Sequence, residues 1–349
     1  MNDNSKFIIL FDSVLDFNDL NEINAKNKSK IISFDYDTHK ILKDKKINHE
    51  ISDNYLSKKD LRMIQKTAYK VSEWFDTDEI LEYISYQGVN VGSLIQDELI
   101  NILVNYIKKF FELYKISKQF DNFTFFGSHI FCEIMKFFSK NTIKFKNSKK
   151  ESFEQLPLDS IKMKMKIGTK NHSIEFGISK NLFKKLKIVS EKSTKLLLPK
   201  NNLVKEIDKN ILIIEFNAIQ YESFFDKMPN SNINFFMYNR RRPAFWNFQG
   251  YNLVKQSGCF VETESSLSDT NFKKTVSDGK LQMETKLLSL FSKESFFKSF
   301  FSLDGISFWL TFKSFFQEFL RKRTFEFIEE IELTKKLMEK YHFSSILIL

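Results

Sequence analysis

The sequence predicts an α/β protein with largely parallel sheet layers, a β-hairpin insertion and a helical C-terminal segment. Short apolar runs of strand length recur along the chain, and segments with apolar residues at helical spacing separate them. Strands that alternate with helices in this way are typical of parallel sheets covered by helices. With 349 residues, the chain is long enough for two domains that each bury a core.

Residues 1–146 are expected to form the first α/β domain. Apolar runs predict strands at residues 7–11, 31–34, 123–126 and 143–145. Periodic apolar residues predict helices at residues 61–74, 93–114 and 128–138.

Residues 147–207 are expected to separate this domain from the next. The segment at 146–157 is polar and rich in lysine, which indicates a linker. Residues 161–167 alternate strictly between apolar residues and lysine, as in a strand with one wet face. A turn at 168–171 returns the chain into a second strand at 172–178. The pattern therefore predicts a β-hairpin, and a helix near residues 182–191 follows it.

A second α/β unit is expected at residues 208–265. Its strands are predicted at 211–216, 233–238 and 259–261, with helices at 219–227 and 251–256. Residues 266–342 are predicted to be helical, with stretches near 280–303, 305–322 and 324–342. Residues 343–349 have the pattern of a buried strand with no polar exit, so we expect a truncated chain or the first strand of a further domain.

Three consecutive arginines, Arg240, Arg241 and Arg242, mark the segment most typical of a binding site. Only six of the 54 basic residues are arginine, so the background composition does not account for this cluster. Guanidinium groups match phosphate or carboxylate, and the cluster follows a predicted parallel strand at the edge where α/β sheets bind ligands. Trp246 offers a flat surface for a sugar or a base. The alternative is a solvated basic loop whose arginines pair with surface acids.

Polar side chains surround this cluster in the sequence. Glu215 and Asn217 end the preceding predicted strand, and Asn239 and Asn247 flank the arginines. The three asparagines are expected to give directional hydrogen bonds to a ligand. Glu215 is expected to orient the arginines or to act as a base, and the alternative is a carboxylate that only pairs with an arginine.

A weaker candidate follows the predicted strand at 123–126. The backbone amide of Ser128 is expected to hold an anion at the start of a helix, and His129 to act as a base. The alternative is a structural histidine. The glycines at positions 88 and 92 resemble a phosphate loop only superficially, because no predicted strand precedes them and the dinucleotide fingerprint is absent.

Composition narrows the class of partner. The net charge of +10 favours an anionic partner, although compositional drift toward lysine also explains it. Two distant cysteines and five histidines without ligand spacing predict no disulfide framework and no metal site, and no cofactor is expected. Five phenylalanines of the C-terminal segment fall on one face of a predicted helix, and they are Phe308, Phe312, Phe315, Phe316 and Phe319. This apolar face predicts a helix that either packs on the core or lies on an anionic membrane.

Two parts of the sequence carry a resemblance to a known family. The first comprises residues 33–40, 55–56 and 88–94, and the second comprises residues 215–217 and 239–247. They resemble a group of microbial surface-polysaccharide biosynthesis proteins, glycosyltransferases of the GT-B type with two Rossmann-like domains. The resemblance implies that the first domain binds the acceptor, the second binds a nucleotide-sugar donor, and no metal is needed. The second domain would begin near Ile346, so the chain would lack it.

The sequence therefore predicts the acceptor-side part of a GT-B-like glycosyltransferase of surface-glycan assembly. Its expected partners are a nucleotide-sugar donor and a glycan or lipid-linked acceptor. The arginines would bind a phosphate or an acidic sugar, and Trp246 would stack on a sugar ring. The alternative is a basic α/β protein without enzymatic activity that binds nucleic acid or a membrane surface. The predicted location is the cytoplasm, and the alternative is a peripheral position at the inner face of the membrane.

Overall fold

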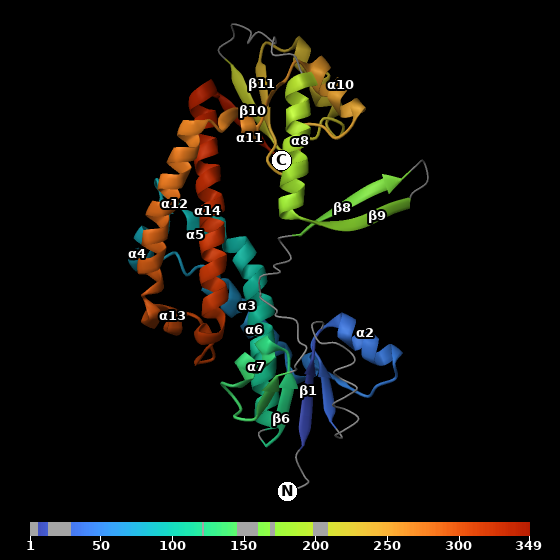
Figure 1. Ribbon diagram of the computed structural model, residues 1–349, viewed down its shortest axis with the longest axis vertical. Coiled ribbons are helices and arrows are strands. Elements are labelled where there is room, and N and C mark those ends of the chain that lie inside the picture. Colours follow the sequence, from blue (N-terminus) through green and yellow to red (C-terminus); the bar gives the residue numbers. More distant parts are fainter. Residues whose placement is uncertain (1–5, 13–28, 121, 145–159, 168–171, 198–208) are drawn as a thin grey trace. The chain divides into compact units, whose positions relative to one another are not determined.

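The computed structural model describes residues 6–12, 29–120, 122–144, 160–167, 172–197 and 209–349. The protein is α/β with parallel sheets, as predicted, and its chain divides into two compact units (Figure 1). Unit 1 comprises residues 1–155 and 282–324, and unit 2 comprises residues 156–281 and 325–349. The predicted linker at 146–157 and the hairpin turn at 168–171 lie outside the described residues.

Unit 1 contains a five-stranded parallel sheet in the order β3-β2-β1-β6-β7. Its strands are β1 (Phe7–Phe11), β2 (Lys30–Ser33), β3 (Glu50–Ile51), β6 (Thr124–Gly127) and β7 (Thr142–Lys144). β1 is apolar throughout because it has a neighbour on each side and is buried on both faces. The strand order reverses between β1 and β6, and the carboxyl ends of two such strands form the switch point at which open α/β sheets bind ligands.

Helices and two small hairpins complete unit 1. The helices are α2 (Tyr36–Asp44), α3 (Lys58–Ser72), α4 (Asp78–Ile84), α5 (Val91–Leu94), α6 (Gln96–Gln119), α7 (His129–Met135) and α13 (Glu294–Phe300), with a 3-10 turn at Ser52–Tyr55. The hairpins are β4 (Ser85–Tyr86) with β5 (Val89–Asn90), and β13 (Ser302–Leu303) with β14 (Ile306–Ser307). Gly88 turns the first hairpin with a φ of 82°. The segment that superficially resembled a phosphate loop therefore starts in a hairpin turn and continues through β5 into α5, and β4 precedes it although no strand was predicted there.

Unit 2 contains a four-stranded parallel sheet in the order β12-β11-β10-β15. Its strands are β10 (Asn210–Ile214), β11 (Asn234–Tyr238), β12 (Phe260–Glu262) and β15 (Ser345–Ile348). The strand order reverses between β10 and β15, which creates a second switch point. Residues 343–349, where the sequence predicted a buried strand that starts a further domain, contain β15, which pairs with β10 of this sheet. The expected burial is wrong, because all four residues of β15 are exposed.

Helices cover both faces of the unit 2 sheet. α9 (Glu222–Phe225) and α10 (Phe248–Ser257) lie on one face, and α11 (Glu264–Leu267) and the C-terminal part of the helix at Trp309–Tyr341 lie on the other. Unit 2 also contains α8 (Lys180–Leu197) and a 3-10 turn at Met228–Asn230. One face packs Ile213, Met237 and Val254 together, and the other packs Leu212 and Phe236 against residues of α14. The predicted hairpin is confirmed as β8 (Ser160–Ile167) and β9 (His172–Ser179).

Two long helices, α12 (Thr270–Phe291) and α14 (Trp309–Tyr341), contribute residues to both units. The predicted break of α14 near residue 323 is wrong. Arginine and lysine are good helix formers, and Arg323 is buried where its guanidinium forms an ion pair with Glu98 of α6.

The phenylalanine face of α14 packs on the core of unit 1. Phe308, Phe312, Phe316 and Phe319 are each at most 2% exposed, and Phe315 is half-buried. The core-facing alternative is therefore confirmed, and the membrane-facing one is wrong for this helix. Among the described residues, no helix is both long enough and apolar enough to cross a membrane.

Candidate functional site

The arginine segment lies where the sequence placed it, at the carboxyl edge of the parallel sheet of unit 2. It begins directly after β11, whose neighbour β10 ends at Ile214 and is followed by Glu215. Asparagine or glycine is usual at positive φ, but Glu215 adopts this left-handed conformation with a φ of 64°. A non-glycine residue there costs about 1 to 3 kcal/mol and persists only where its surroundings hold it in place.

The loop itself holds Glu215 in this conformation. One carboxylate oxygen, Oε1, accepts hydrogen bonds from the backbone amides of Arg240 (2.6 Å) and Arg241 (2.8 Å). The guanidinium of Arg242 donates to the backbone oxygen of Glu215 at 2.6 Å. Because Glu215 is only 3% exposed and its carboxylate serves the loop, the geometry matches the alternative of an arginine-paired carboxylate rather than a base that faces substrate.

The three guanidinium groups have different environments. Arg240 forms an ion pair with Glu330 of α14, and burial lowers the pKa of Arg240. The Nε atom of Arg242 lies 3.6 Å from Oε2 of Glu215. The Nε atom of Arg241 lies 3.9 Å from the same oxygen, and 75% of the Arg241 side chain is exposed. Of the three, Arg241 is therefore the one placed to meet a dissolved anion.

The asparagines predicted to contact a ligand are bonded to the backbone of this loop and its neighbours. Asn239 is buried and donates from Nδ2 to the backbone oxygen of Phe216 at 2.8 Å. The Oδ1 atom of Asn217 accepts from the amide of Ile219 at 3.1 Å. Asn247 is the N-cap of α10, because its Oδ1 accepts from the amide of Gly250 at 2.9 Å.

Trp246 lies in this loop with its ring half exposed. Its ring centroid is 6.1 Å from that of Phe183 on α8. About half of the indole is exposed, and its stacking on a sugar or a base stays a prediction.

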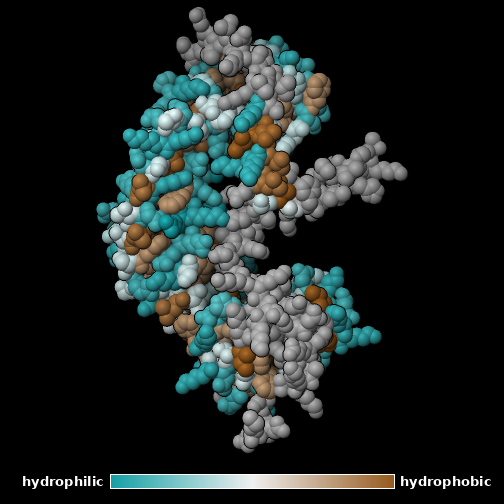
Figure 2. All heavy atoms as spheres, viewed as in Figure 1, coloured by the Kyte–Doolittle hydropathy of each residue, from teal (hydrophilic) through white to brown (hydrophobic). Residues whose placement is uncertain are grey.

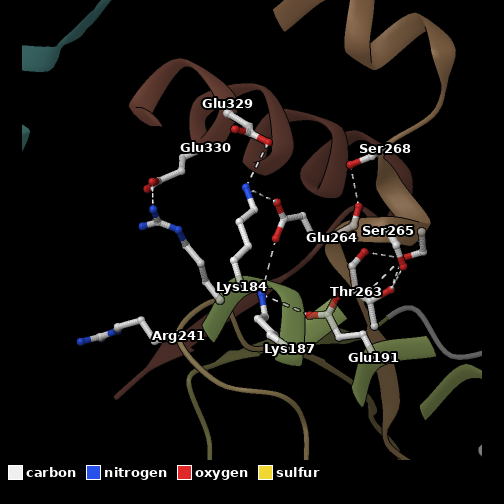
Figure 3. A network of polar contacts seen from close by, with 12 residues as sticks. Lys184, Lys187, Glu191, Arg241, Thr263, Glu264, Ser265, Ser268, Glu329 and Glu330 are labelled. Carbon is white, nitrogen blue, oxygen red and sulfur yellow. Dashed lines mark hydrogen bonds and ion pairs between the residues drawn. The ribbon is translucent and has the colours of Figure 1, made fainter. Parts of the chain in front are cut away.

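A network of ion pairs adjoins the loop, and sequence reasoning did not find it (Figure 3). Lys187 of α8 is buried and lies 3.2 Å from Glu191 and 3.5 Å from Glu264. Lys184, one turn earlier, lies 3.6 Å from Glu264 and 3.8 Å from Glu329. The Lys187–Glu191 spacing is visible in the sequence, but nothing in the sequence shows that this pair faces inward. The acids balance the nearby bases, so this neighbourhood has no large surplus of positive charge.

The weaker candidate lies at the switch point of unit 1. Ser128 is fully buried and donates its hydroxyl hydrogen to Asp12 Oδ2 at 2.7 Å. Asp12 directly follows β1, and sequence reasoning missed it although an acid after a buried strand is a usable signal. The side chain of His129 is 41% exposed and lies 4.0 Å from Glu133.

No metal site competes with these two places in the described part of the chain. There, no three histidine, cysteine or acidic side chains converge in a way that would hold an ion. One pair of histidines lies close together, with Nδ1 of His39 2.9 Å from Nε2 of His49. Comparisons with known proteins find no matching family model, no matching curated protein and no matching solved structure.

Proposed function

We propose that the protein is a glycosyltransferase of GT-B-like architecture in surface-polysaccharide biosynthesis. It would transfer a sugar from a nucleotide-sugar to a glycan or lipid-linked acceptor without a metal ion. The strand orders support this proposal, because each unit carries a parallel sheet with a switch point of the Rossmann-like kind. The resemblance placed the start of the donor domain near Ile346, and Ile346 lies in β15, a strand of the unit 2 sheet. In this proposal unit 2 therefore takes the donor side, and unit 1 takes the acceptor side.

The observation that carries the proposal is the loop at residues 239–247. Its backbone is fixed at the carboxyl edge of the sheet by Glu215, while the Arg241 guanidinium extends into solvent. A preorganised cation at this edge suits the phosphate of a nucleotide-sugar and the charge that develops on its leaving group. Trp246, half exposed in the same loop, suits stacking on a sugar or base.

Unit 1 would supply the acceptor side of the reaction. In this proposal, His129 accepts the proton of the attacking hydroxyl group, because its imidazole is exposed beside the switch point. The bond between Ser128 and Asp12 ties the segment that carries His129 to the end of β1. Asp12 and Ser128 are then positioning residues.

Calorimetric titration with uridine-, guanosine- and thymidine-diphosphate sugars tests the proposal. The wild-type protein should bind at least one of them. Arg241→Ala should weaken that binding about 10- to 100-fold, because a charge-assisted hydrogen bond contributes about 1.5 to 3 kcal/mol. Arg62→Ala is the matched control, since it removes an exposed arginine on α3 of unit 1 and should leave binding unchanged.

Two results would overturn the proposal. One is the absence of binding for every nucleotide-sugar, and the other is equal affinity for wild type and Arg241→Ala. Tight binding of single-stranded RNA that weakens steeply with added salt, without any nucleotide-sugar binding, would instead establish the nucleic-acid alternative.

A further inference from the structure

Helix α8 of unit 2 buries charged residues and exposes apolar ones, the reverse of an ordinary amphipathic helix. Its charged residues Lys187 and Glu191 face inward and are each 3% exposed. Its apolar residues Leu182, Leu186 and Val189 are 47%, 47% and 63% exposed. These three residues are spaced by four and three positions, so they form one stripe along the helix, which we call the α8 stripe.

The buried side of α8 explains why the stripe faces outward. Lys187 contacts Glu191 of its own helix and Glu264 of α11, and Lys184 reaches Glu264 and Glu329. Figure 3 shows both lysines extending from α8 toward Glu264. A rotation that buried the stripe would break these contacts and leave buried acids without their cations, which is strongly unfavourable. The ion pairs therefore fix the helix with its apolar stripe in solvent.

Basic and aromatic side chains lie beside the α8 stripe. Lys185 and Lys192 are exposed on its flank, since both lie next to it on the helical wheel. Trp246, near the first turn of α8, is 53% exposed beside Phe183. Apolar residues gather over the N-terminal half of this helix, with hydrophilic residues around them (Figure 2).

We propose that the α8 stripe is a docking surface for an anionic phospholipid membrane. A helix with an apolar stripe flanked by lysine lies in the plane of the lipid headgroups, and tryptophan prefers the same depth. The charge selects this occupant, because Lys185 and Lys192 complement anionic headgroups and the chain carries a net charge of +10. The proposal is independent of the sugar-transfer reaction and concerns a different helix from the buried phenylalanine face of α14.

Co-sedimentation of the full chain with vesicles tests this proposal. One set of vesicles holds equal parts of phosphatidylglycerol and phosphatidylcholine, and the other holds phosphatidylcholine alone. The wild-type protein should sediment with the anionic vesicles and remain in solution with the neutral ones. Two variants should each bind anionic vesicles with at least about tenfold lower affinity than the wild type. One is the triple variant Leu182→Ser, Leu186→Ser, Val189→Ser, and the other is the double variant Lys185→Glu, Lys192→Glu.

Matched variants on α12 control for the loss of apolar surface and of charge. Leu281→Ser with Leu288→Ser removes two exposed leucines, and Lys273→Glu with Lys274→Glu reverses two exposed lysines. Both should bind anionic vesicles as the wild type does. Circular dichroism of every variant confirms that it is folded before its binding is compared.

Three outcomes would overturn the proposal. They are the absence of wild-type sedimentation with anionic vesicles, unchanged binding of both α8 variants, and equal binding to neutral vesicles. Sedimentation velocity adds a further one: a concentration-dependent dimer that the triple variant loses would show that a second copy, and not lipid, covers the stripe.

Discussion

A single buried carboxylate organises the arginine loop. Glu215 adopts a φ of 64° while its Oε1 atom receives the amides of two successive arginines. The amides fix the backbone of the loop, and this leaves the side chain of Arg241 available to solvent. The glutamate thus acts through the arginines rather than on a ligand.

Replacing Glu215 tests this organising role. Glu215→Ala should lower the free energy of unfolding by about 3 kcal/mol, because two partly buried backbone donors lose a charged acceptor. Glu215→Gly should cost about 1 kcal/mol less than the alanine variant, since glycine adopts a positive φ without strain. Urea unfolding followed by circular dichroism measures both. Equal stability of the alanine and glycine variants would contradict the strain at this position.

A second buried acid makes the stability of unit 1 depend on pH. Glu112 of α6 is fully buried, and burial raises its pKa from 4.5 to about 7, although Lys108 at 3.5 Å opposes the shift. Between these two pH values the folded protein holds a proton that the unfolded chain has released. The protonated Glu112 therefore adds its full share to the free energy of unfolding below pH 4.5, and this share is lost as the pH rises to about 7.

The variant Glu112→Gln isolates this contribution, because glutamine does not ionise. Relative to the wild type, the variant should gain about 3 kcal/mol of stability between about pH 5 and about pH 8. Urea unfolding at several pH values gives this difference. Glu82→Gln, at an exposed position on α4, is the control and should show no such trend. A difference between wild type and Glu112→Gln that does not change with pH would show that Glu112 is ionised throughout.

At the scale of the elements, side-chain caps determine where helices begin. Ser57 and Asp60 form a reciprocal capping box at the start of α3, and Asp35 accepts from the amide of Thr38 at the start of α2. Asn247 does the same for α10, immediately after the arginine loop. The loop is therefore anchored at both ends, by Glu215 at its start and by a helix cap at its end.

Substitutions at Asn247 separate a cap from a ligand contact. Asn247→Ala should lower the free energy of unfolding by about 1 kcal/mol, and Asn247→Ser should largely restore it, because serine also caps helices. Unfolding curves and calorimetry with a nucleotide-sugar should be measured on both variants. If the serine variant keeps its stability but loses nucleotide-sugar binding, Asn247 contacts the ligand directly.

At the scale of the whole molecule, the sequence predicted strands best where both faces are buried. β1 and β10 were found because their apolar runs are uninterrupted, whereas β3 was missed because Glu50 and Ile51 carry no such pattern. The pairing of β15 with β10 was not predicted, since the pairing of distant strands leaves no local signal. Composition and strand position were enough to locate the arginine loop.

Contacts between distant parts of the chain limited the prediction of the site. The ion pair of Arg240 with Glu330 and the burial of Lys187 depend on how α14, α11 and α8 pack in unit 2. The asparagines were predicted as ligand contacts because their type suits binding. Asn239 instead donates to the backbone oxygen of Phe216, which follows the neighbouring strand β10, and Asn247 caps α10.

The pairing of β15 with β10 has a consequence for synthesis on the ribosome. Ile211 of β10 pairs with Ser345 of β15, and the helices α12, α13 and α14 are translated between them. Until that stretch has emerged, the β10 edge of the nascent sheet presents unpaired backbone groups of an apolar strand. Pairing at such sequence separation is slow, so the emerging chain passes through a period in which this edge is open to aggregation or to a chaperone.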